Sequence, residues 1–83
     1  MIPEPGMKYS VKNELIELIE SKLIVLNTVQ NLAIFTFDGC VFNLILVGGI
    51  PELILPSDCQ FETKRFVLDT WNEMNRIDWN GRT

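Results

Sequence analysis

The chain of 83 residues contains no histidine, and this absence excludes much ordinary enzyme chemistry. Histidine is the commonest general base, the usual partner of Ser and Cys nucleophiles, and the most frequent metal ligand. The carboxylates lack the alternating spacing of a calcium loop, and no Lys follows Gly48-Gly49 as in a phosphate-binding loop. We therefore predict no catalytic residue, no cofactor and no metal site, and we expect that the protein is not an enzyme.

Basic residues are also scarce. Seven Lys and Arg stand against eleven Asp and Glu, which gives a formal net charge of −4. A protein that binds nucleic acid neutralises phosphates with clustered Lys and Arg, and the basic residues here are scattered. The composition argues against a nucleic-acid partner and favours a protein or a basic partner.

Long apolar runs are missing as well. The most apolar segment, 32–55, contains Asp38 and Glu52, and residues 39–51 between them fall short of the ~20 apolar residues that span a bilayer. The first residues, Met1 to Gly6, have neither the basic start nor the apolar core of a secretory signal. We expect no membrane partner and a cytoplasmic location.

The two cysteines, Cys40 and Cys59, do not have the spacing of a zinc site. In a reducing compartment, free cysteine behaves as a small apolar residue. We predict that Cys40 is such a core residue and that Cys59 is incidental. A reactive thiol or a bridge between the two is the alternative.

An Asp38-Gly39 pair between two apolar runs gives the clearest structural signal. Asp-Gly suits a type I′ turn, which needs positive φ at both central residues of a hairpin. With these two as the loop, Phe37 faces Cys40, and the register continues outward until Leu32 faces Ile45. Because side chains alternate between the faces of a sheet, one face is wholly apolar. That face carries Ala33, Phe35, Phe37, Cys40, Phe42 and Leu44.

A helix is predicted from Ser10, whose hydroxyl would cap its first turn. Residues 1–9, with three Pro or Gly residues, are expected to form a flexible lead-in. The β-branched run from Ile24 to Val29 predicts a strand, and continuation of the helix to about Leu26 is the alternative. The positions at helical spacing are Val11, Leu15, Leu18, Ile19, Lys22 and Leu23.

A second helix is predicted to start near Asp58, because Ser57 and Gln60 have the spacing of a capping box. We expect it to end near Ile77 and to be followed by a short tail, residues 79–83. Its stripe contains Phe61, Val67, Leu68, Trp71 and Met74, and Asp78 follows at the same spacing. Before it, Gly48-Gly49 is expected to break the ladder, and residues 50–56, with two prolines, to form a short extended piece at a sheet edge or outside the sheet.

These elements predict one α+β domain of two layers, residues 10–78. The order is helix, three strands with a possible fourth, then helix, and the strands form an antiparallel meander. If both helices cover the apolar hairpin face, the opposite face stays open and is too apolar for water. We expect a second copy to cover it across a two-fold axis, and one helix on each face is the alternative. The candidate dimer face contains Ile34, Thr36, Val41, Asn43 and Ile45.

Two further features indicate contacts with a partner. Glu14, Glu17 and Glu20 recur every three residues and form an acidic edge on the first predicted helix. Trp79 lies in the tail near Arg76 and Arg82, a combination that protein interfaces favour, although docking onto its own domain is the alternative.

No motif in the chain is specific enough to indicate a family. The sequence predicts a small non-catalytic protein-binding module, a homodimer that acts by occluding or bridging a protein partner as an inhibitor or adaptor. The alternatives are a carrier of a small apolar ligand, held between sheet and helices, and, ranked last, an enzyme that uses carboxylates alone. Its carboxylates would be Glu14, Glu17 and Glu20, or Asp69 and Glu73.

Overall fold

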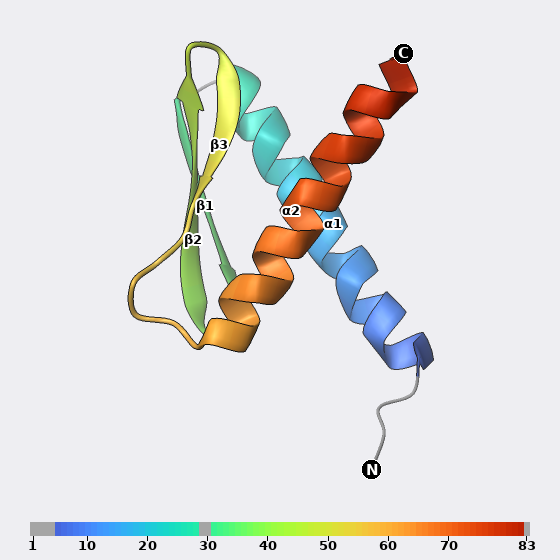
Figure 1. Cartoon of the computed structure of the whole chain (residues 1–83). Coiled ribbons are helices and arrows are strands. Elements are labelled where there is room, and N and C mark those ends of the chain that lie inside the picture. Colours follow the sequence, from blue (N-terminus) through green and yellow to red (C-terminus); the bar gives the residue numbers. More distant parts are fainter. Residues whose placement is uncertain (1–4, 29–30, 83) are drawn as a thin grey trace.

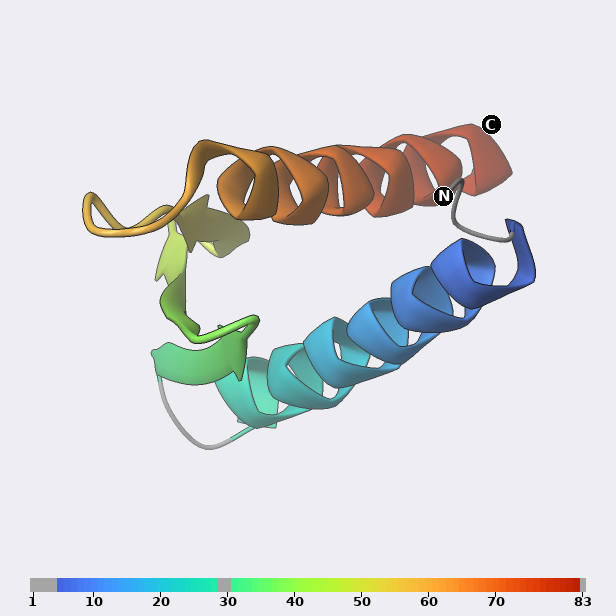
Figure 2. The same cartoon turned by 90° about the horizontal axis from the view of Figure 1, so that it is seen from below.

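The computed structural model describes the backbone of residues 5–28 and 31–82 and the side chains of residues 11–28 and 31–75. Both helices lie on one side of a single antiparallel sheet with the strand order β1-β2-β3 (Figures 1 and 2). The predicted α+β class is confirmed. The elements in chain order are α1 (Pro5–Thr28), β1 (Leu32–Phe37), β2 (Cys40–Val47), β3 (Ile50–Ile54) and α2 (Phe61–Arg82).

The hairpin of β1 and β2 has the predicted register. Phe37 pairs with Cys40 and Leu32 with Ile45, with every pair between them as expected. Asp38 and Gly39 have φ values of 52° and 78°, as a type I′ turn requires. Ala33, Phe35, Cys40, Phe42 and Leu44 are buried on one face, and Phe37 is half-buried beside them. The local turn chemistry therefore determines which side chains enter the core.

Gly48 and Gly49 form a second two-residue turn, with φ values of 60° and 82°, and Val47 pairs directly with Ile50 across it. The expected break in the ladder is wrong, because two residues with positive φ complete a tight hairpin. The predicted edge position is confirmed for β3. Pro51 is tolerated there because an edge strand leaves alternate backbone N–H groups without a ladder partner.

Helix α1 is longer at both ends than the sequence indicates. It begins at Pro5, so Ser10 lies inside the helix and is not its cap; residues 1–4 of the predicted lead-in lie outside the described residues. The predicted strand is wrong for residues 24–28, because these residues belong to the helix, which ends at Thr28. Its last residue, Val29, is not among those described.

Packing explains the helical conformation of this β-branched segment. Leu26 is buried on the same stripe as Leu15 and Ile19, so the helix adds a further apolar contact to the core. Thr28 Oγ1 donates a hydrogen bond to the Ile24 carbonyl at 2.7 Å, within the helix. Tertiary burial thus outweighs the modest preference of β-branched residues for strands.

Helix α2 begins at Phe61 and ends at Arg82. The predicted capping box is wrong, because Ser57, Asp58 and Cys59 form a bend outside the helix. The carbonyl of Gln60 instead accepts the first helical hydrogen bond, from the Lys64 amide at 3.0 Å. At the other end, residues 79–82 of the predicted tail belong to the helix, and residue 83 lies outside the described part of the chain.

Cys40 and Cys59 form a disulfide, with 5.8 Å between their Cα atoms. The prediction that both are unpaired is wrong. The bond attaches the start of β2 to the bend before α2, and this attachment helps explain why residues 57–60 do not join the helix. It lies beside a core to which both helices and the strands contribute: Leu15, Ile19, Leu26, Ala33, Phe35, Cys40, Phe42, Leu44, Val67 and Trp71.

Within the described residues, neither helix combines the length and apolar character that crossing a bilayer requires.

Candidate functional site

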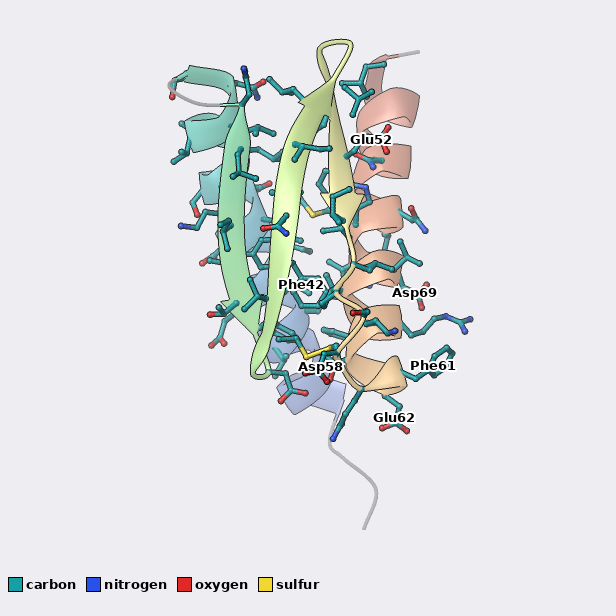
Figure 3. The ribbon with its side chains drawn as sticks, turned by 90° about the vertical axis from the view of Figure 1, so that its left-hand side faces the viewer. Phe42, Glu52, Asp58, Phe61, Glu62 and Asp69 are labelled. Atoms are coloured by element: carbon teal, nitrogen blue, oxygen red, sulfur yellow. A yellow bond between two sulfur atoms is a disulfide. The ribbon has the colours of Figure 1, made fainter. Side chains whose placement is uncertain are left out.

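The two helices cover only one face of the sheet, and the other face is bare. Figure 3 looks onto this bare face; Phe42 lies behind it, fully buried against the helices. We call the bare side the outer sheet face. It is formed by Leu32, Ile34, Thr36, Val41, Asn43, Ile45, Val47, Ile50, Glu52 and Ile54.

The outer sheet face is both apolar and exposed to solvent. Apart from Thr36, Asn43 and Glu52, its side chains are all aliphatic. Ile34 and Val41 retain 48% and 49% of their accessible surface. Exposed apolar surface of this continuity is unusual on a monomer and is typical of protein interfaces. Glu52, its one charged residue, lies on the edge strand β3 and not at the centre (Figure 3).

The predicted dimer-face residues all belong to this surface. Ile34, Thr36 and Val41 are exposed, whereas Asn43 and Ile45 are half-buried. The central strand β2 and the edge strand β1 position them, because the Asp38-Gly39 turn sets their register. The alternative of one helix on each face is wrong. Whether a second copy occupies this face stays a prediction.

The acidic edge lies elsewhere. Glu14, Glu17 and Glu20 are exposed on α1, outside its buried stripe. Neither described ion pair involves them. The side chain of Trp79 is not among those described, so its contacts stay a prediction; its backbone belongs to α2.

The remaining two candidate carboxylates, Asp69 and Glu73, make ion pairs at the surface. Glu73 Oε1 forms an ion pair with Lys12 Nζ at 2.6 Å, and this pair links α2 to α1. Asp69 pairs with Arg65 Nε at 3.2 Å, one turn away on the same helix. Among the described residues, no three metal-ligating side chains come together. Both carboxylates therefore take part in ion pairs at the surface.

A shallow hollow of about 260 Å³ lies between α1 and the free edge of β1. It is lined by Lys22, Val25, Leu32, Ala33 and Ile34. The hollow is open to solvent and does not lie between the sheet and both helices, where the carrier alternative would need its ligand. This position does not favour a carrier.

The side chain of Phe61 does not lie where its sequence pattern predicts. Phe61 was expected on the buried stripe of the second helix, yet 69% of its surface is exposed, and it points away from the sheet next to Glu62 (Figure 3). The buried stripe contains Thr63 and Val67, and Phe61 lies two residues before Thr63, about 200° around the helix, so it faces the opposite side. Phe66 then stacks on Phe37, with 5.8 Å between the ring centroids.

Comparison of the chain with protein-family models, with curated proteins and with solved structures gives no match.

Proposed function

We propose that the chain is a non-catalytic protein-binding module that forms a homodimer through the outer sheet face and acts by occluding or bridging a protein partner. The observation that supports this proposal is the exposed aliphatic surface of β1, β2 and β3 opposite the helices. Burial of such surface contributes about 25 cal/mol per Å² and is the main driving force of association.

A second copy is a suitable occupant of this face. A two-fold contact places the same surface on both sides, so an apolar face meets an apolar face. Glu52 would lie toward the rim of the contact, because β3 is an edge strand. Charged residues are tolerated at interface rims and are depleted at interface centres.

The acidic edge is available for the partner. Glu14, Glu17 and Glu20 are exposed on α1, which lies on the other side of the sheet from the outer sheet face. A dimer joined through its sheets would therefore present one acidic edge on each outer side. A basic protein surface is the complementary partner, and two such edges would allow bridging.

Light scattering after size exclusion tests the dimer. Val41→Lys places a charge on the outer sheet face, on β2 opposite Thr36, and should halve the wild-type mass. The matched control is Ile24→Lys, because Ile24 is similarly aliphatic, 65% exposed and on α1. The control should retain the wild-type mass. A wild-type monomer over a wide concentration range, or equal masses for all three proteins, would overturn the proposed contact.

Affinity capture followed by mass spectrometry tests the partner site. We expect the triple change Glu14/Glu17/Glu20→Lys to lose a partner that wild type captures. The charge-matched control changes Asp58, Glu62 and Asp69 to Lys, all of them exposed and away from this edge. If both triple variants retain the partner equally, the acidic edge is not the contact.

A further inference from the structure

Strand β1 has a free edge whose backbone groups point toward solvent. In a two-residue hairpin, the residues that flank the turn exchange both backbone hydrogen bonds, here Phe37 and Cys40. Bonding then alternates along the strand, so Phe35 and Ala33 also point their backbone groups toward β2. The N–H and C=O groups of Leu32, Ile34 and Thr36 therefore point away from the sheet.

The two edges of the sheet differ in their protection. On β3 the same alternation points the backbone groups of Pro51 away from β2, and proline has no N–H that could bond to another strand. Glu52 adds a charge beside it. Strand β1, with the sequence LAIFTF, contains neither a proline nor a charged residue. Proteins normally guard an exposed edge with such residues, so an unguarded edge is the one suited to pairing.

We propose that β1 pairs antiparallel with β1 of a second copy, across a two-fold axis at Ile34. In this register Leu32 lies opposite Thr36 of the partner subunit, and the reverse pair follows by symmetry. The three residues with outward backbone groups, Leu32, Ile34 and Thr36, then pair with the same three residues of the second copy. Each of their free N–H groups can donate a hydrogen bond to a C=O of the other strand. The strand carries no charge, so the pairing brings no like charges together along the ladder.

The side chains along this edge also fit a second strand. On the helix side, Ala33 would lie beside Phe35 of the partner subunit, a small residue next to a large one. The hollow between α1 and β1 lies beside this edge, and its lining is aliphatic apart from Lys22: Lys22, Val25, Leu32, Ala33 and Ile34. The pairing would therefore add apolar contacts along the edge.

This contact is separate from the proposed contact through the outer sheet face. The two-fold axis of an antiparallel strand pair is perpendicular to the sheet, whereas stacking two sheets face to face requires an axis parallel to it. The contacts can therefore coexist, and perpendicular two-fold axes that meet produce a closed tetramer. We expect wild type to be heavier than a dimer when both contacts form.

Proline at an outward N–H tests the edge directly. Thr36→Pro removes one outward donor and no hydrogen bond to β2, so the fold should persist, as circular dichroism can show. We expect this variant to have half the wild-type mass by light scattering. Thr36→Val, which keeps the N–H, is the matched control and should retain the wild-type mass. Combining Thr36→Pro with Val41→Lys should give a monomer.

Three outcomes separate the proposals. If Thr36→Pro is folded and retains the wild-type mass, edge pairing is overturned. If Thr36→Pro halves the mass and Val41→Lys does not, the edge pairing stands and the face contact fails. Should Thr36→Pro not fold, Leu32→Pro at the start of β1 replaces it, and amide exchange on wild type decides: slow exchange at Ile34 and Thr36 supports pairing, and fast exchange overturns it.

Discussion

At the residue scale, two contacts attach the β1–β2 hairpin to the first turn of α2 and to the bend before it. One is the Cys40–Cys59 disulfide, and the other is a hydrogen bond that Thr63 Oγ1 donates to Asp38 Oδ2 at 2.6 Å. Asp38 thus forms part of the β1–β2 turn and also accepts a hydrogen bond from α2. The sequence does not reveal this second role, because the two residues of each pair are far apart in the chain.

Loss of the Thr63 hydroxyl should measurably weaken the attachment. Thr63→Val removes the donor to Asp38 with little change in shape, and we expect the free energy of unfolding to fall by about 1–2 kcal/mol. Thr70→Val is the matched control, because Thr70 is also buried but donates only to the Phe66 carbonyl in its own helix. Urea unfolding of both variants checks this. A cost for Thr70→Val that equals or exceeds that of Thr63→Val would contradict it.

Removal of the disulfide should cost more. Cys40 and Cys59 are 19 residues apart, and closing a loop of about this size stabilises a protein by about 3 kcal/mol in the chain-entropy model. We expect Cys59→Ser to lower the free energy of unfolding by about that amount in denaturant titrations. Wild type in a reducing buffer should match the variant. Equal stability of oxidised and reduced wild type would argue against the bond.

The disulfide also bears on the predicted cytoplasmic location, which stays a prediction. Disulfides persist in oxidising compartments, and cytoplasmic thiols are generally kept reduced. In the cytoplasm the protein would therefore exist mainly in the less stable, reduced form, with Cys40 still buried in the core.

At the element scale, the accuracy of the sequence predictions depended on whether the signal was local. The hairpin register followed from Asp38-Gly39 and the alternation on either side of it, and both are properties of adjacent residues. The end of α1 depended instead on the burial of Leu26 against the strands. The start of α2 was misplaced for a similar reason, because the bond from Cys59 to Cys40 lies outside any local pattern.

Two alanine substitutions distinguish a helix from a strand at the end of α1. In a strand, Ile24 and Leu26 would lie on the same face, whereas in the helix they lie on nearly opposite sides. Leu26 is fully buried and Ile24 is 65% exposed. We expect Leu26→Ala to cost about 2–5 kcal/mol and Ile24→Ala to change stability by less than about 0.5 kcal/mol. Similar costs in denaturant titrations would contradict the helical assignment.

At the scale of the whole molecule, the sequence predicted which residues share the outer sheet face but not whether a helix covers it. Alternation along the hairpin placed Ile34 and Val41 together from the start. Where the helices pack depends on contacts between distant segments, such as the Lys12–Glu73 ion pair and the stacking of Phe66 on Phe37. The free edge of β1 became visible only once the helix replaced the predicted preceding strand.

Self-association should make thermal stability depend on protein concentration, because mass action favours the folded assembly. For a dimer of a chain this small, a tenfold rise in concentration should raise Tm by about 3–6 °C in reversible scanning calorimetry. The combined variant Thr36→Pro with Val41→Lys should lose this dependence, since it disrupts both the edge of β1 and the outer sheet face. Ile24→Lys, which changes neither β1 nor the outer sheet face, should keep it. A concentration-independent Tm for wild type would mean that both surfaces stay exposed and that the chain folds as a monomer.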